Sequence, residues 1–286
     1  METILLLQSL AHPVLNIVAL ALTNLGSEEA YIVMLLITYV AIDARAGRIL
    51  GLALLGSFYL NQVLKDLFDT TRPYLLHPEL LLGGEAAAGT APGPAFPSGH
   101  AQSATTFWGL AAALLRRRWF TGLALLLIAL VSATRLYLGV HWPIDVAGGI
   151  LIGLAVVVAV MALVIRRPRL GPVTLVALLV VVPLVLHLAW PTPESGIIAG
   201  AFVAFATAPL LFPYRAEGSV AGRTGTAVLG LALTFGWLTA TSVLLPDELK
   251  EHVLVAPARY LLLGWAGLIA TPWLAAKIGL HPGPRT

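Results

Sequence analysis

Long runs of apolar residues dominate this chain, and short polar or Gly- and Pro-rich segments separate them. A helix needs about 20 predominantly apolar residues to cross the hydrocarbon core of a bilayer, and most of these runs approach that length. The first run contains Gln8, His12 and Pro13, so a re-entrant or interfacial segment is the alternative to a span there. The pattern predicts about ten spans, near residues 3–22, 28–43, 46–68, 98–116, 119–140, 143–167, 170–190, 194–213, 224–245 and 252–278.

The composition supports a membrane protein. Of the 286 residues, 58% are hydrophobic and 11% are charged, and the mean hydropathy is +0.90. Soluble domains carry about 25% charged residues, so an ordinary soluble globule is excluded. We expect an all-α, polytopic transmembrane helical bundle. The chain has no cysteine, which excludes disulfides, thiolate metal sites and a cysteine nucleophile.

The basic residues are distributed unevenly among the connections between the predicted spans. Cytoplasmic loops of membrane proteins are enriched in Lys and Arg, so every second connection is predicted to be cytoplasmic. This orientation accounts for most of the 17 basic residues without a nucleic-acid partner. Lys250 and Arg259 lie on the opposite, outer side and have no such explanation. The cytoplasmic markers are Arg45, Arg48, Arg116, Arg117, Arg118, Arg166, Arg167, Arg169, Arg215, Arg223, Lys277 and Arg285.

Three clusters of polar residues interrupt the apolar pattern at the predicted outer ends of the spans. Ionisable groups at a bilayer edge are costly and usually functional. The loop cations alone set this orientation, and it places all three clusters on the outer side of the membrane. Their shared side suggests that the clusters converge on one site. The clusters are Lys65 to Arg72-Pro73, Pro97-Ser98-Gly99-His100, and Thr134-Arg135 through His141 to Asp145.

The residue types in these clusters fit an anion with several oxygens. Lys65, Arg72 and Arg135 offer three cations with many N–H donors, for which phosphate is the commonest match. Ser98 and Gly99 begin a predicted helix, where free N–H groups and the helix dipole also favour an anion. Taken singly, these residues have ordinary explanations as membrane anchors or helix caps. Together they suggest phosphoryl chemistry.

The two histidines supply the reactive groups. His141 lies four positions before Asp145, and Pro143 fits the first position of a helix, so the carboxylate can approach one ring nitrogen. The other nitrogen is then free to act as a nucleophile. His100 is the candidate proton donor to a leaving group.

The three clusters resemble the signature of the type 2 phosphatidic acid phosphatase superfamily, which includes glucose-6-phosphatase and vanadium haloperoxidases. The signature is a Lys with six residues before Arg-Pro, then Pro-Ser-Gly-His, then Ser-Arg with five residues to His and three more to Asp. Every interval matches, and Thr134 replaces the usual Ser. The resemblance covers about residues 1–167, a six-helix core, and leaves about four further helices in residues 168–286 without an explanation.

The resemblance implies a role for each matching residue. His141 would attack phosphorus and form a phosphohistidine, Asp145 would hold its ring, and His100 would protonate the leaving oxygen. It implies no cofactor and no metal, which is reasonable because the cations already neutralise phosphate oxygens. The implied phosphate-binding residues are Lys65, Arg72, Ser98, Gly99 and Arg135.

We therefore expect a phosphatase of phosphatidate-like or polyprenyl (pyro)phosphate lipids in the plasma (inner) membrane, with its active site on the extracytoplasmic face. The Gly-, Ala- and Pro-rich segment at residues 80–96 could then act as a flap over the headgroup. One alternative is a phosphatase of a soluble ester, similar to glucose-6-phosphatase. Another is a non-catalytic lipid or phosphate carrier, suggested by the extra helices and by Arg259.

Overall fold

The computed structural model describes residues 1–166 and 168–281, so Arg167 and Arg285 of the topology argument lie outside the described residues. Every regular element in the described chain is helical, as predicted. The chain forms two compact units, one of Met1–Tyr31 with Ser57–Arg167 and the other of Ile32–Gly56 with Pro168–Thr286. Residues 32–56 thus belong with the C-terminal unit, whereas the predicted domains divide the chain once, at 167/168.

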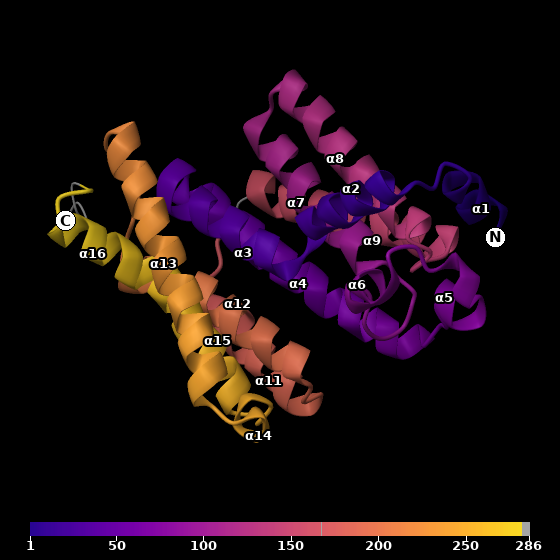
Figure 1. Cartoon of the computed structure of the whole chain (residues 1–286). Coiled ribbons are helices and arrows are strands. Elements are labelled where there is room, and N and C mark those ends of the chain that lie inside the picture. The colour runs from indigo at the N-terminus through magenta and orange to yellow at the C-terminus, as the bar shows by residue number, and fades with distance from the viewer. Residues whose placement is uncertain (167, 282–286) are drawn as a thin grey trace. The chain divides into compact units, whose positions relative to one another are not determined.

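The first unit contains the three polar clusters. Within it α7 packs against α8 and α9, which lie together in Figure 1, and α2 contacts α8. Helices α3 and α4 each contribute residues to both units. The elements are α1 (Glu2–Gln8), α2 (Pro13–Thr23), η1 (Asn24–Gly26), α3 (Glu28–Ile37), α4 (Ala44–Phe68), α5 (Pro73–Leu76), η3 (Pro78–Leu80), α6 (Gly84–Gly89), α7 (Gly99–Leu115), α8 (Arg118–Tyr137) and α9 (Pro143–Arg166).

The first apolar segment is not one straight span. Helices α1 and α2 meet at a bend of 118°, which makes the pair either a broken span or a re-entrant loop. Pro13 is the first residue of α2, and it cannot continue a helix from the preceding turn because it lacks an N–H. The Nδ1 atom of His12 accepts a hydrogen bond from the Val14 N–H at 3.3 Å and caps α2.

Small residues allow α9 to approach α7 closely. A Cβ atom added at Gly149 would lie 2.5 Å from the Ser98 carbonyl oxygen, and one at Gly153 would lie 2.7 Å from that of Gln102. Both distances are shorter than real contacts, so only glycine fits at these positions. The G-x-x-x-G motif of α9 therefore serves packing within this chain, and it holds the start of α7 beside the start of α9.

The second unit is built around the pair α12 and α15, with α11 beside α12 and α13 beside α16. The cations that the topology left unexplained have local partners here. Lys250 Nζ binds Asp247 Oδ1 at 2.8 Å, and Arg259 Nε donates to Thr241 Oγ1 at 2.7 Å. The elements are η2 (Thr38–Ile42), α10 (Pro172–Val176), η4 (Ala177–Val181), α11 (Val182–Ala189), α12 (Pro193–Leu211), α13 (Val220–Leu244), α14 (Asp247–Lys250), α15 (Val255–Trp265), η5 (Ala266–Ala270) and α16 (Thr271–Lys277).

Four helices of the described chain are long and apolar enough to cross a membrane, namely α8, α9, α12 and α13, and the bent pair α1 and α2 would add a fifth. The protein is therefore a multi-pass membrane protein. The other predicted spans coincide with helices that are shorter, interrupted by π turns or more highly charged, such as α4 and the run from α15 to α16. Their passage through the bilayer, and the division into six plus four spans, stay predictions.

Candidate active site

Four helix ends in the first unit carry the predicted site residues. Lys65 lies in the last turn of α4, and Arg72 follows in the connection to α5. Ser98 is the N-cap of α7, where its Oγ accepts from the Ala101 N–H at 3.5 Å. Arg135 lies in the last turn of α8, and Asp145 lies in the first turn of α9. Pro143 begins α9, as the sequence predicted.

The turn between α8 and α9 depends on a glycine. Gly139 has φ +71°, and a Cβ atom there would lie 2.0 Å from the Leu80 carbonyl oxygen. A larger residue would meet both a strained backbone and a clash. This turn presents His141, whose side chain is 2% exposed, to the interior of the unit.

His141 lies between a carboxylate and a guanidinium. Its Nδ1 atom is 3.4 Å from Asp145 Oδ2, close enough for an ion-pair contact but not aligned as a hydrogen bond. The same carboxylate oxygen accepts from the Trp142 N–H at 2.7 Å, which fixes its position. The Nε2 atom lies 3.1 Å from Arg72 Nη1. Because a guanidinium can only donate, Nε2 is the acceptor, and the ring proton belongs on Nδ1, facing Asp145.

Arg72 is 1% exposed, and it is surrounded by oxygen atoms of the backbone. Its Nε donates to the Gly93 carbonyl at 2.8 Å, and Nη2 donates to those of Pro92 and Pro94 at 2.8 and 2.9 Å. Nη1 donates to the Val140 carbonyl at 2.9 Å as well as to His141. We call residues 90–94 the strap, because carbonyl oxygens of this segment accept hydrogen bonds from the cations of the site.

The other two cations also contact the strap. Lys65 Nζ donates to the Pro94 carbonyl at 2.7 Å and reaches the Pro92 carbonyl at 3.4 Å. Arg135 is fully buried, and its Nη1 donates to the hydroxyls of Thr90 and Thr23 at 2.8 and 2.7 Å. Its Nε is buried without a hydrogen-bond partner among the described residues. The structure thus brings all three predicted cations to one place.

Gly99 and His100 are the first two residues of α7, and the His100 side chain has unused hydrogen-bonding capacity. The Nε2 atom of His100 is buried and makes no hydrogen bond to any described residue. Its ring lies against Gly26, where an added Cβ atom would be 2.9 Å from Cδ2. The Ser98 N–H, in contrast, donates to the Asp145 carbonyl at 3.0 Å, so Ser98 is tied to α9 through its backbone.

A buried polar network supports the segment before α7, and the sequence motifs did not include it. Asn61 Nδ2 donates to the Pro97 carbonyl at 3.3 Å and to Gln102 Oε1 at 2.8 Å. Gln102 Nε2 donates to the carbonyl and the hydroxyl of Ser57 at 2.7 and 2.9 Å. Polar residues inside an apolar helix are expensive unless paired, so their presence in α4 and α7 was the available signal.

The electrostatic environment favours a neutral His141. Burial, followed by the charges of Arg72, Arg135 and Lys65, holds the pKa of His141 well below its ordinary value of 6.5. Burial also lowers the pKa of Arg72 to about 10, so this guanidinium stays charged at neutral pH. An unprotonated imidazole beside a fixed cation is the combination that a nucleophile for an anionic ester requires.

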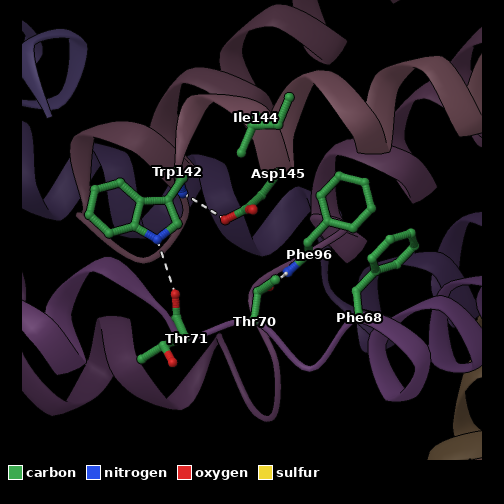
Figure 2. Close-up of a pocket in the computed structure, with 7 residues that line it drawn as sticks. All are labelled: Phe68, Thr70, Thr71, Phe96, Trp142, Ile144 and Asp145. Carbon is green, nitrogen blue, oxygen red and sulfur yellow. Dashed lines mark hydrogen bonds between the residues drawn. The ribbon is translucent and has the colours of Figure 1, made fainter.

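An open pocket of about 360 Å³ adjoins Asp145 (Figure 2). Its walls are mostly apolar. Phe68 and Phe96 pack edge to face with ring centroids 5.0 Å apart, and Trp142 is held by a bond of 3.0 Å from its Nε1 to the Thr71 carbonyl. The pocket therefore places an apolar surface directly beside the polar site. Its lining residues are Phe68, Thr70, Thr71, Phe96, Trp142, Ile144 and Asp145.

Two family models match this chain. Residues 46–169 match the family model of the PAP2 superfamily, and residues 193–283 match that of the PAP2 superfamily phosphatase, transmembrane extension. The second match covers most of the C-terminal helices, for which the three motifs gave no information.

Three individual proteins are similar to this chain. YbjG of Escherichia coli (strain K12), provisionally described as an undecaprenyl-diphosphatase, is 32% identical over 105 residues, which cover 37% of this chain and 50% of YbjG. The undecaprenyl-diphosphatase of Sulfolobus acidocaldarius is 32% identical over 145 residues, which cover 49% of this chain and 66% of that protein.

The crystal structure of Aquifex aeolicus LpxE has a TM-score of 0.49 at 25% identity, covering 56% of this chain and 93% of LpxE. The chain thus spans half the length of the first sequence relative and just under two thirds of the second. With its core and its C-terminal helices both matching family models, the chain belongs to the PAP2 superfamily.

Proposed function

We propose that this protein is an integral-membrane, metal-independent phosphatase that hydrolyses lipid phosphate or diphosphate esters. The observation that carries the proposal is the buried contact of His141 Nε2 with Arg72, next to Asp145 and within a group of three cations. Such a group can bind the oxygens of a phosphate and stabilise the charge that develops during phosphoryl transfer. Lipid diphosphates are the favoured class, because two relatives carry the description undecaprenyl-diphosphatase.

The proposed reaction has two steps. First, His141 Nε2 attacks phosphorus, the bond from phosphorus to the leaving oxygen breaks, and His100 gives that oxygen a proton. Second, water attacks the phosphohistidine, His100 takes the water's proton, and the P–N bond breaks to release inorganic phosphate. The proton on Nδ1 stays with His141 and faces Asp145, whose carboxylate stabilises the positive charge that the ring gains in the first step.

The proposed site faces the extracytoplasmic side of the plasma membrane. The support is the placement of Lys and Arg, which mark the other ends of the helices as cytoplasmic. A lipid held at this level can keep its chain in the bilayer while its phosphate reaches the cations.

A substrate panel tests the function. We expect the purified protein in detergent to release phosphate from undecaprenyl diphosphate, phosphatidate or lysophosphatidate with a kcat/KM at least about 100-fold above that for glucose 6-phosphate, because only the lipids fill an apolar pocket. A preference for glucose 6-phosphate would support the soluble-ester alternative. Absence of turnover, combined with lipid transfer in proteoliposomes, would support the carrier alternative.

The apolar pocket gives a second, narrower prediction. Phe68 is 52% exposed, so Phe68→Ala should preserve the fold while removing one wall of the pocket. We expect kcat/KM for a long-chain lipid phosphate to fall about 5-fold, since losing roughly 1 kcal/mol of apolar contact has that effect. Glycerol phosphate should be cleaved at an unchanged rate. Leu67→Ala is the matched control, because Leu67 is 72% exposed on the same helix and does not line the pocket. Equal losses in both variants would contradict the assignment.

A further inference from the structure

One short segment occupies the donors that a phosphate would need. The strap, residues 90–94, contacts all three cations, and four of its contacting atoms are main-chain carbonyl oxygens. These oxygens belong to Thr90, Pro92, Gly93 and Pro94. A carbonyl oxygen and a phosphate oxygen seek the same N–H groups, so the strap and a bound phosphate compete for them.

The competition is clearest at Arg72, where every donor can be counted. A guanidinium has five N–H bonds, and Arg72 makes five hydrogen bonds: three to the strap, one to the Val140 carbonyl and one to His141 Nε2. No N–H of Arg72 is left for a phosphate oxygen. The nucleophilic nitrogen of His141 is engaged by the same guanidinium. In this arrangement Arg72 and His141 are positioned for the reaction, but a phosphate has no free donor of Arg72 to bind.

We propose that the strap is an autoinhibitory internal ligand, whose carbonyl oxygens hold Arg72 and Lys65 until the phosphate of the substrate displaces them. This inference rests on the phosphatase function proposed above and adds a closed state to it. The substrate's phosphate takes over the N–H groups that Pro92, Gly93 and Pro94 release. Arg72 then turns from His141 Nε2 toward the phosphate, and the nucleophile is uncovered.

The structure of the strap suits such a displacement. Pro92 and Gly93, in the middle of the strap, are exposed, whereas Ala91 within it and Ala95 directly after it are buried. At its C-terminal end, the Ala95 and Phe96 N–H groups each donate at 2.8 Å to Thr70, through the carbonyl and the hydroxyl respectively. The strap is thus anchored at its base, while its tip is held mainly by the cations themselves. If the closed state dominates, the apparent Kd for phosphate is the intrinsic Kd divided by the open fraction.

Gly93→Ala tests this relation. Gly93 has φ +63°, and a Cβ atom added there would have no neighbouring atom within 4 Å, so a methyl group strains the closed strap without a clash. We expect Gly93→Ala to bind inorganic phosphate about 5-fold more tightly in isothermal titration. Gly84→Ala is the matched control, because Gly84 has φ +58°, equally open space and no contact with the cations. Unchanged or weaker phosphate binding in Gly93→Ala would overturn the proposal.

Thiol labelling gives a readout of the strap that does not depend on catalysis. The natural chain has no cysteine, so Ala91→Cys places a single thiol within the strap, at a position that is 3% exposed. We expect saturating inorganic phosphate to speed its alkylation by a maleimide at least about 10-fold. Ala87→Cys, in the same buried cluster but outside the strap, should stay protected.

The outcomes separate the two proposals. Phosphate that binds without changing the alkylation of Ala91→Cys would overturn the strap and leave the phosphatase intact. Equal acceleration in Ala87→Cys would also overturn the strap, since the whole loop would then have opened. A wild-type protein that neither binds phosphate nor releases it from any lipid ester would overturn the proposed function together with the strap.

Discussion

His141→Ala should abolish phosphate release, lowering kcat by at least about 10⁴-fold on the best lipid substrate, because the variant lacks the atom that attacks phosphorus. Binding should persist, since the three cations remain. Binding of inorganic phosphate within about 5-fold of wild type would therefore accompany the loss of kcat. Steady-state phosphate release and calorimetric phosphate binding are the two measurements. Measuring both separates the loss of the nucleophile from a loss of folding, because the His141 side chain is 2% exposed and also contributes to packing.

His77→Ala is the matched control for this variant. His77 lies in the connection between α4 and α7, not in the turn that carries His141, and its Nδ1 contacts Glu79 Oε1 at 3.3 Å on the surface. It should retain full activity. A second measurement traps the intermediate. With an aryl phosphate, whose leaving oxygen needs no proton, His100→Ala should slow mainly the second step and let phosphate accumulate on His141, detectable by mass spectrometry of the intact protein. Phosphate release that continues undiminished in His141→Ala would remove His141 from the mechanism.

The residues that the sequence could identify share one property, namely that their chemistry is unusual for their surroundings. Lys65, Arg72 and Arg135 stand out because cations are rare in apolar helices, and the structure brings all three to one place. The pairing of His141 with Asp145 also followed from spacing, because residues at the start of a helix meet those of the preceding turn.

Other parts of the site depend on contacts between residues that are distant in sequence. The hydrogen bonds of Arg135 to Thr23 and Thr90 span 112 and 45 residues, and a threonine at the end of an apolar run has no distinctive pattern. The composition of residues 80–96 suggested a flap, but the strap contacts the cations through main-chain carbonyls, which every residue has, so no side-chain motif predicts these contacts. The bend between α1 and α2 was only partly foreseen, because a proline predicts an interruption but not an angle.

Arg72 offers the second large effect, through the geometry of its guanidinium. Arg72→Lys keeps a positive charge but replaces five donors in a planar fork with three on a single nitrogen. A fork can bind two phosphate oxygens at once, and an ammonium cannot do so with the same geometry. We expect kcat/KM for a lipid phosphate to fall about 10²- to 10³-fold, which corresponds to roughly 3–4 kcal/mol of lost transition-state stabilisation. Arg117→Lys, on the exposed start of α8, should behave like the wild type.

The pH dependence distinguishes charge from geometry at this position. The charge of Arg72 is, after burial, the largest cause that lowers the pKa of His141. Removing it in Arg72→Gln should raise that pKa toward the ordinary value of 6.5, so more of the histidine is protonated at a given acidic pH. Since protonated His141 cannot attack phosphorus, the acid limb of the kcat/KM profile should move to higher pH in Arg72→Gln. In Arg72→Lys the charge remains, and the limb should stay near its wild-type position despite the loss of rate. Identical limbs in the two variants would show that another group sets the acid limb, and His141 would then not be the titrating nucleophile.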